Sequence, residues 1–99
     1  MILLTKEIIK KLPPLNATDG KPNNEKEIIV KFFTPDAQWT WYVLEGEKEG
    51  NDWCFFGLVD GLEKELGYFT LNQLLEVRGK FNLPIERDRN FSGKLSEYI

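Results

Sequence analysis

Apolar residues recur at every third or fourth position over residues 4–12, a spacing that predicts a short amphipathic helix. Thr5 is suited to be its N-cap, because a threonine hydroxyl can accept a hydrogen bond from a free N–H of the first turn. The pair Pro13-Pro14 ends the helix, since the residue before a proline avoids the helical conformation. The polar segment 16–24, rich in turn-forming residues, then predicts a loop.

Three segments rich in β-branched and aromatic residues predict β-strands at 27–33, 39–44 and 53–59. A turn at Thr34-Pro35-Asp36 separates the first two strands. The acidic, glycine-containing segment 45–52 predicts a hairpin loop between the second and the third. Connections this short make consecutive strands antiparallel neighbours.

The dipeptide Asp60-Gly61 between apolar runs is a hairpin signal, so a shorter fourth strand is expected at 65–69. The alternative is a helical turn through 62–66, and the pattern does not decide between them. Gly57, inside the third predicted strand, indicates a bulge or a close approach of another chain segment.

A second helix is predicted to begin after Thr70, because Thr70 and Gln73 have the spacing of a capping box. Gly79 fits the position just after the end of this helix, where left-handed backbone is common. The segment 83–88 is extended by its proline and is expected at a sheet edge, where a missing N–H is tolerated.

This order of elements predicts the fold class. We expect one α+β domain over residues 1–99: an antiparallel meander of three to four strands, with an N-terminal helix and a second helix packed on one face. Within the strand 39–44, Trp39 and Trp41 share one face and Tyr42 points to the other. Either the tail and loops close the second face, or that face is exposed and binds a partner.

The composition of this chain excludes several kinds of chemistry and does not point to a particular one. Its 99 residues contain no histidine and one cysteine, Cys54. This excludes Ser-His-Asp and Cys-His catalysis and the common Cys/His zinc sites within the chain, and no cofactor is expected. A lone thiol fits the reducing cytoplasm, and no apolar run approaches the ~20 residues that span a bilayer.

Charge is unevenly distributed along the chain. The net charge is −3, which disfavours nonspecific binding to nucleic acid or anionic lipid. Residues 45–65 hold seven acids and two bases, whereas residues 78–94 hold five bases and two acids. The basic region leaves a nucleic-acid-associated regulator as an alternative function. A histidine-free carboxylate or metal enzyme is the other alternative, with a hard cation held by some of Asp60, Glu63, Glu65, Glu86 and Asp88.

Four stretches give the chain a specific likeness. They are FFTP at 32–35, WTWY at 39–42, FGLVDGLEKELGYF at 56–69 and LPIERD at 83–88. In these stretches the chain resembles a bacterial family of short proteins of unknown function that are encoded on plasmids, conjugative elements and phages. The resemblance brings no catalytic residues, and it implies an accessory role in a mobile genetic element.

We therefore expect a non-enzymatic accessory protein that binds a protein partner in the cytoplasm, with inhibition of host defence as the specific form of this hypothesis. Exposed aromatic side chains would anchor the partner, and charged side chains would set its register. The residues expected to bind it are Trp39, Trp41, Asp60, Glu63, Glu65, Arg87 and Asp88. No membrane contact is expected, and the pattern does not indicate an oligomeric state.

Overall fold

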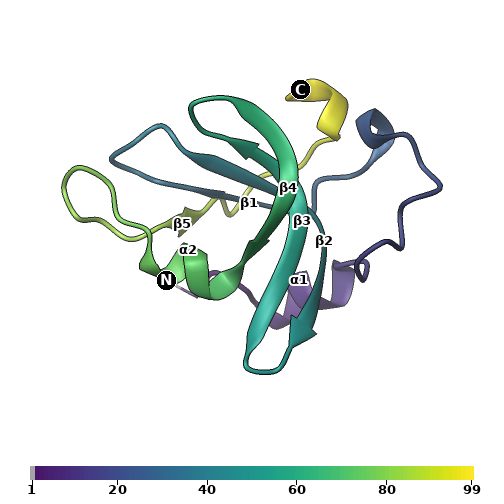
Figure 1. Ribbon diagram of the computed structural model, residues 1–99, viewed down its shortest axis with the longest axis horizontal. Coiled ribbons are helices and arrows are strands. Elements are labelled where there is room, and N and C mark those ends of the chain that lie inside the picture. Colours follow the sequence, from purple (N-terminus) through teal and green to yellow (C-terminus); the bar gives the residue numbers. More distant parts are fainter. Residues whose placement is uncertain (1) are drawn as a thin grey trace.

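An antiparallel five-stranded sheet is the centre of the fold. The computed structural model describes residues 2–99, and its strands lie in the order β4-β3-β2-β1-β5 (Figure 1). The strands are β1 (Val30–Phe33), β2 (Thr40–Glu49), β3 (Asp52–Asp60), β4 (Lys64–Thr70) and β5 (Glu86–Arg87). Two α-helices, α1 (Lys6–Lys11) and α2 (Leu71–Glu76), and two 3₁₀ turns, η1 (Asn23–Glu25) and η2 (Leu95–Glu97), complete the described elements.

The α+β class is thus confirmed, but the predicted three to four strands are too few. The fifth strand, β5, comes from the segment 83–88, which lies at the sheet edge beside β1 as predicted. There Phe32 pairs with Arg87 and Phe33 with Glu86. A strand of two residues carries almost no signal of its own, because alternation needs at least four residues to be recognised.

Both helices begin at the predicted caps. The Thr5 hydroxyl accepts a hydrogen bond from the Ile8 N–H at 3.3 Å, although α1 covers Lys6–Lys11 rather than the whole of 4–12. The capping box of α2 is complete: the Gln73 N–H donates to Thr70 Oγ1 at 3.1 Å, and the Thr70 N–H donates to Gln73 Oε1 at 2.9 Å. These local hydrogen bonds satisfy backbone donors that the helices cannot satisfy internally.

The predicted role of Gly79 is wrong. Helix α2 ends at Glu76, and Val77 is already extended, with ψ of 136°. Gly79 instead leaves room for a side chain from the β1–β2 turn, since a Cβ at Gly79 would lie 1.9 Å from Asp36 Oδ1. The other oxygen of Asp36 accepts a hydrogen bond from the Phe81 N–H at 2.6 Å, which ties the segment after α2 to that turn.

The acidic segment 45–52 is not a hairpin loop, contrary to the prediction. Strand β2 continues to Glu49, and the turn to β3 consists of Gly50 and Asn51. Gly50 has φ of +60°, a conformation that favours glycine. The sheet is therefore longer at this end than the charge-rich sequence suggests.

The Glu45 carboxylate explains why a charged segment continues the strand. The register shifts between Val43 and Glu45, which marks a β-bulge in β2. The buried carboxylate accepts hydrogen bonds from the N–H groups of Asn16 at 2.8 Å and Thr18 at 3.0 Å, and also from the Thr18 hydroxyl. These contacts with the 16–24 loop are made across a long stretch of sequence, and the local pattern does not contain them.

The segment after Asp60-Gly61 is a strand, so the helical-turn alternative is wrong. Strand β4 pairs with β3 over its whole length, from Cys54↔Thr70 to Asp60↔Lys64. Gly57 is the close-approach position that its place in the strand indicated, because an added Cβ would lie 1.9 Å from the Tyr42 carbonyl oxygen.

One face of the sheet, here called the helix face, carries the larger hydrophobic core. Phe32, Val43 and Phe55 lie on it. They pack with Leu12, the residue after α1, and with Leu74 of α2. The opposite face is here called the tail face. Figure 1 shows the C-terminal segment and η2 on the other side of the sheet from α1 and α2.

The tail covers the second face over β2 and the neighbouring part of β3, which answers the question that the strand 39–44 raised. On the tail face, Tyr42 and Leu58 form a second buried cluster with Leu95 of η2. The ring of Tyr42 stacks on that of Tyr98, with centroids 4.8 Å apart. Aromatic residues on both faces of β2 are therefore explained by two cores. Among residues 2–99, no helix is long and apolar enough to cross a lipid bilayer.

Candidate functional site

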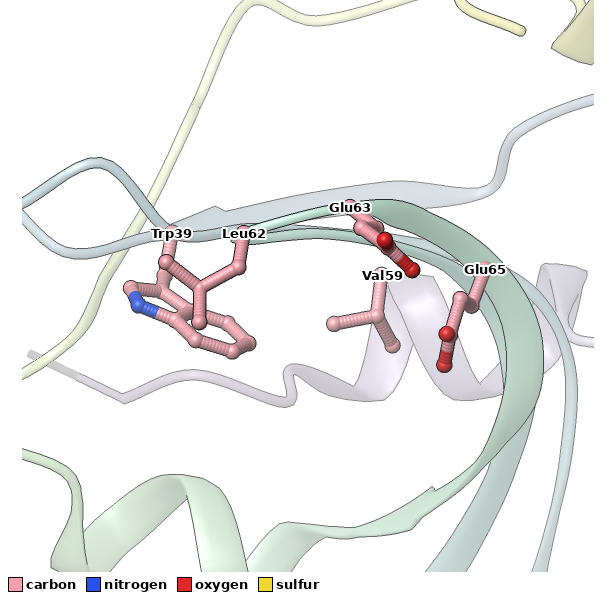
Figure 2. A pocket seen from close by; sticks show the side chains of 5 residues that line it. All are labelled: Trp39, Val59, Leu62, Glu63 and Glu65. Carbon is pink, nitrogen blue, oxygen red and sulfur yellow. The ribbon is translucent and has the colours of Figure 1, made fainter.

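Three of the seven predicted site residues meet on the helix face. Trp39, Glu63 and Glu65 line a hollow of about 340 Å³ together with Val59 and Leu62. We call this the Trp39 hollow. Figure 2 shows all five side chains projecting from the same side of the sheet, from the residue before β2, the end of β3, the β3–β4 turn and β4.

The Trp39 indole packs against two neighbouring residues. It stacks on Trp41, with ring centroids 6.0 Å apart and planes inclined by 26°. It also packs against the backbone of Gly61, where an added Cβ would lie 2.3 Å from Cζ3 of the indole. Trp41 is 6% exposed and Trp39 is 38% exposed, so a buried ring supports a ring that reaches solvent.

The backbone of Trp39 is fixed by the β1–β2 turn. The Thr34 N–H donates to the Trp39 carbonyl at 3.0 Å, and the Trp39 N–H donates to the Thr34 hydroxyl, also at 3.0 Å. Thr34 itself is buried. Leu62, at the rim of the hollow, is 93% exposed.

The charge of the hollow is negative and uncompensated. Glu63 and Glu65 are exposed, and among the residues that the structure describes neither forms an ion pair. Lys64, between them, points away and donates its Nζ to the Tyr98 carbonyl at 2.8 Å. Two carboxylates beside a partly exposed indole are an arrangement that attracts a cation, through charge and through the π system.

The remaining four predicted site residues lie elsewhere. Trp41 belongs to the hydrophobic core of the helix face and is only 6% exposed. Asp60 follows Val59 in β3 and therefore points to the tail face. Burial first, and then the charges of Asp60 and Tyr98, raise the pKa of the Tyr42 hydroxyl above its ordinary value.

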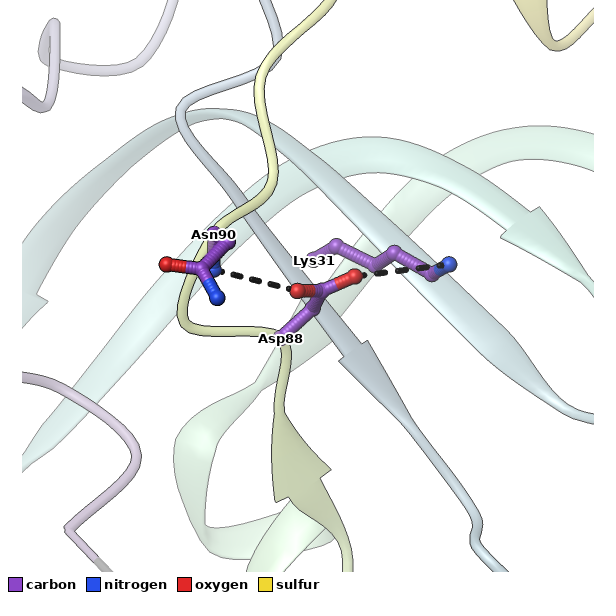
Figure 3. Close-up of polar contacts among 3 residues, drawn as sticks. All are labelled: Lys31, Asp88 and Asn90. Atoms are coloured by element: carbon purple, nitrogen blue, oxygen red, sulfur yellow. Dashed lines mark hydrogen bonds and ion pairs between the residues drawn. The ribbon is translucent and has the colours of Figure 1, made fainter.

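Arg87 and Asp88 support the fold at the β5 edge. The Arg87 guanidinium donates hydrogen bonds to the carbonyl oxygens of Ile2 and Leu3, the second at 3.2 Å, and so ties the N-terminal segment to the sheet. Asp88 forms an ion pair with Lys31 at 3.9 Å and accepts from the Asn90 N–H at 3.1 Å (Figure 3). These two residues lie at the opposite edge of the sheet from β4, and the structure does not bring them to the Trp39 hollow.

Cys54 is a poor nucleophile in this environment. Burial first, and then the carboxylates of Glu49, Glu47 and Asp52, raise the pKa of its thiol above the ordinary value. A raised pKa keeps the thiol protonated at neutral pH, whereas the thiolate is the reactive form.

The alternative functions find limited support in the described part of the chain. No group of three or more Cys, Asp or Glu side chains in residues 2–99 converges in a way that could hold a metal ion. In the basic region 78–94, Arg78 donates to the carbonyl oxygens of Leu75 and Val77 at the end of α2. Arg87 is engaged as described above, so part of this basic charge is used within the fold.

Sequence reasoning did not include Val59 and Leu62 in the site. Val59 pairs with Trp41 across β2 and β3, so alternation alone would place it on the helix face. The signal at Leu62 is a large apolar residue between a turn glycine and Glu63, where turns normally carry polar side chains.

The fold and the Trp39 hollow define a small α+β protein whose sheet has a hydrophobic core on each face and which carries an acidic, aromatic surface hollow. The family model described as "Protein of unknown function (DUF2958)" matches residues 3–99. The chain belongs to this family. No curated protein and no solved structure matches this chain.

Proposed function

We propose that this protein is a non-enzymatic accessory protein of a mobile genetic element and acts in the cytoplasm by binding a protein partner through the Trp39 hollow. One observation carries the binding proposal: a partly exposed indole, stacked on the buried Trp41, lies beside two carboxylates that have no ion-pair partner in residues 2–99. Exposed tryptophans with rigid support are typical binding hot spots.

The chemistry of the hollow selects a basic side chain of the partner. A guanidinium or ammonium group over an indole contributes about 0.5–1 kcal/mol when exposed, and more when desolvated. Glu63 and Glu65 add charge attraction, and the exposed Leu62 offers an apolar rim that a partner would cover. Arginine fits best, since its planar group can stack on the ring and donate to a carboxylate at the same time.

The biological setting of this proposal rests on the resemblance of the four sequence stretches to proteins of plasmids, conjugative elements and phages. An accessory protein of such an element meets host proteins directly, and inhibition of a host defence protein is the specific form we propose. A small acidic surface site suits that role, because it can occupy a basic functional surface of the host protein.

The test is affinity capture from a bacterial host lysate with the tagged chain. We expect at least one captured protein to be lost with Trp39→Ala and with the double variant Glu63→Gln/Glu65→Gln. Two controls alter similar groups elsewhere: Phe81→Ala removes another exposed ring, and Asp19→Asn/Glu25→Gln removes two exposed acids. If the hollow variants retain every protein that the control variants retain, the hollow is not the binding site.

A further inference from the structure

Strand β4 is an edge of the sheet, and the direction of its backbone groups can be worked out from its neighbours. In an antiparallel sheet, the N–H and C=O of one residue point to the same neighbouring strand, and the next residue points to the other. The Val43 carbonyl accepts from the Ile29 N–H at 2.8 Å, so Val43 points toward β1. Tyr42 must then point toward β3, where it pairs with Leu58.

The same alternation continues across β3 into β4. Leu58 points toward β2, so its neighbours Gly57 and Val59 point toward β4 and hydrogen bond with Gly67 and Glu65. Leu66 and Tyr68 therefore direct their N–H and C=O groups away from the sheet. Thr70 has the same parity, and its N–H indeed leaves the sheet to join the capping box of α2.

The outward groups of β4 are open to pairing. No group within residues 2–99 accepts a hydrogen bond from the N–H of Leu66 or Tyr68. An edge of this kind is a template for an additional strand.

The side chains of β4 differ between the two faces. On the tail face, Leu66 is 37% exposed and Tyr68 is 63% exposed, and Tyr68 packs against Phe56 with ring centroids 5.1 Å apart. On the helix face, Glu65 is part of the Trp39 hollow, and a Cβ at Gly67 would meet nothing within 4 Å. The edge therefore offers apolar contacts on one face and acidic, open space on the other.

We propose that an extended, basic segment of a partner protein pairs with β4 as a sixth strand, with its basic side chains on the helix face and its apolar side chains on the tail face. The apolar residues would pack on Leu66 and Tyr68, and the basic ones would lie beside Glu65 over the space at Gly67. This deepens the proposed function, from which it takes the basic partner, but it depends on the backbone of β4 rather than on the indole of Trp39.

Charge complementarity favours this occupant over a second copy of the chain. Each copy has a net charge of −3, and self-pairing of two β4 strands would bring only Lys64 as a basic residue. The carboxylates of Glu63 and Glu65 would remain without a cation. A basic strand satisfies both the backbone groups and the acidic residues.

The experiment uses the full chain and a synthetic seven-residue peptide with alternating lysine and valine, acetylated and amidated at its ends. We expect the peptide to bind and to slow hydrogen exchange of the Leu66 and Tyr68 amides, while the Gly67 amide, already bonded to β3, changes little. At a peptide concentration of 100 times Kd, the slowing expected is about 100-fold. Methylation of the backbone nitrogens that face β4 in the peptide should abolish binding, and an alternating glutamate–valine peptide should not bind.

The outcomes separate this inference from the proposed function. Binding without slowed exchange at Leu66 and Tyr68, or unchanged binding of the methylated peptide, overturns strand pairing and leaves the Trp39 hollow as a site. The inference is also overturned if the free chain dimerises in sedimentation experiments and this dimerisation protects the same amides from hydrogen exchange. Failure of the lysine–valine peptide to bind overturns it as well.

In the variant Trp39→Ala we expect the affinity for the peptide to fall about 5- to 30-fold, with the protection of the β4 amides retained at saturation. An unchanged affinity in that variant counts against the hollow but not against the edge.

Discussion

Trp39 lies on Trp41 with ring centroids 6.0 Å apart, so that one indole of the WTWY stretch is a core residue and the other is a surface residue. The two rings share a face of the sheet, as alternation predicts, but they differ in position along it. Trp41 pairs with Phe32 and Val59 in the middle of the sheet, whereas Trp39 precedes the first residue of β2. The pair therefore joins the core to the Trp39 hollow.

This difference predicts unequal effects of two similar substitutions. Trp41→Ala removes a buried ring and should lower the free energy of unfolding by about 3–5 kcal/mol. Trp39→Ala leaves the core filled and should lower it by roughly 1–2 kcal/mol. Urea unfolding followed by circular dichroism measures both, and equal losses would contradict the division of roles.

Gly57 and Gly67 form a matched pair, because they face each other across β3 and β4. Gly57→Ala should destabilise the protein by about 1–3 kcal/mol, since its Cβ would lie 1.9 Å from the Tyr42 carbonyl oxygen and the strands would have to move apart. Gly67→Ala should be neutral or slightly stabilising, because nothing lies within 4 Å of its added Cβ and alanine restricts the unfolded chain. Thermal unfolding of the two variants checks this, and a similar loss in both would show that the close approach at Gly57 has no energetic effect.

Glu45 should make stability depend on acid pH. Burial alone would raise the pKa of its carboxyl, but hydrogen bonds from Thr18 and Asn16 and the charge of Lys26 outweigh burial and hold the pKa below the ordinary 4.5. A lowered folded-state pKa means that this stabilisation is complete above about pH 4.5 and is lost as the pH falls through the folded pKa.

The variant Glu45→Gln isolates this effect. It should cost about 2 kcal/mol at pH 7, because the amide cannot replace a charged acceptor of several hydrogen bonds. The difference from the unmodified chain should shrink as the pH falls below 4.5. Denaturant midpoints measured between pH 7 and pH 3 test this. The control is Asp19→Asn, which neutralises an exposed acid in the 16–24 loop that Glu45 contacts. A constant difference over that range would assign the loss to packing rather than to charge.

Much of the fold could be predicted because its signals are local. The Thr70–Gln73 capping box, the Thr5 cap and the alternation in β2 each involve residues a few positions apart. The wrong predictions concern segments whose structure depends on residues far away in the sequence. Strand β2 continues through acidic residues because Glu45 accepts hydrogen bonds from Asn16 and Thr18, 29 and 27 residues away.

The candidate site was only partly predictable for the same reason. Glu63 and Glu65 are near each other in sequence, and a glycine turn brings them to Trp39. The exposure of Trp39 and the burial of Trp41 depend on how α1, α2 and the N-terminal segment cover the helix face. Arg87 and Asp88 have charges suited to a binding site, but their partners are the carbonyl oxygens of Ile2 and Leu3 and the side chain of Lys31.

The closure of the tail face gives the last prediction. Leu95 is fully buried against the sheet, in the same cluster as Tyr42 and Leu58. Leu95→Ala should lower the free energy of unfolding by about 2–5 kcal/mol, because it leaves a cavity between η2 and β2. Leu62→Ala removes the same side chain from a position that is 93% exposed and should change stability by less than about 0.5 kcal/mol. Equal stabilities of the two variants in urea unfolding would mean that the tail does not contribute to the core. If the tail is needed as described, Leu95→Ala should also raise the exposure of the Tyr42 ring and bring its raised pKa back toward 10, measurable by ultraviolet absorbance in alkaline titration.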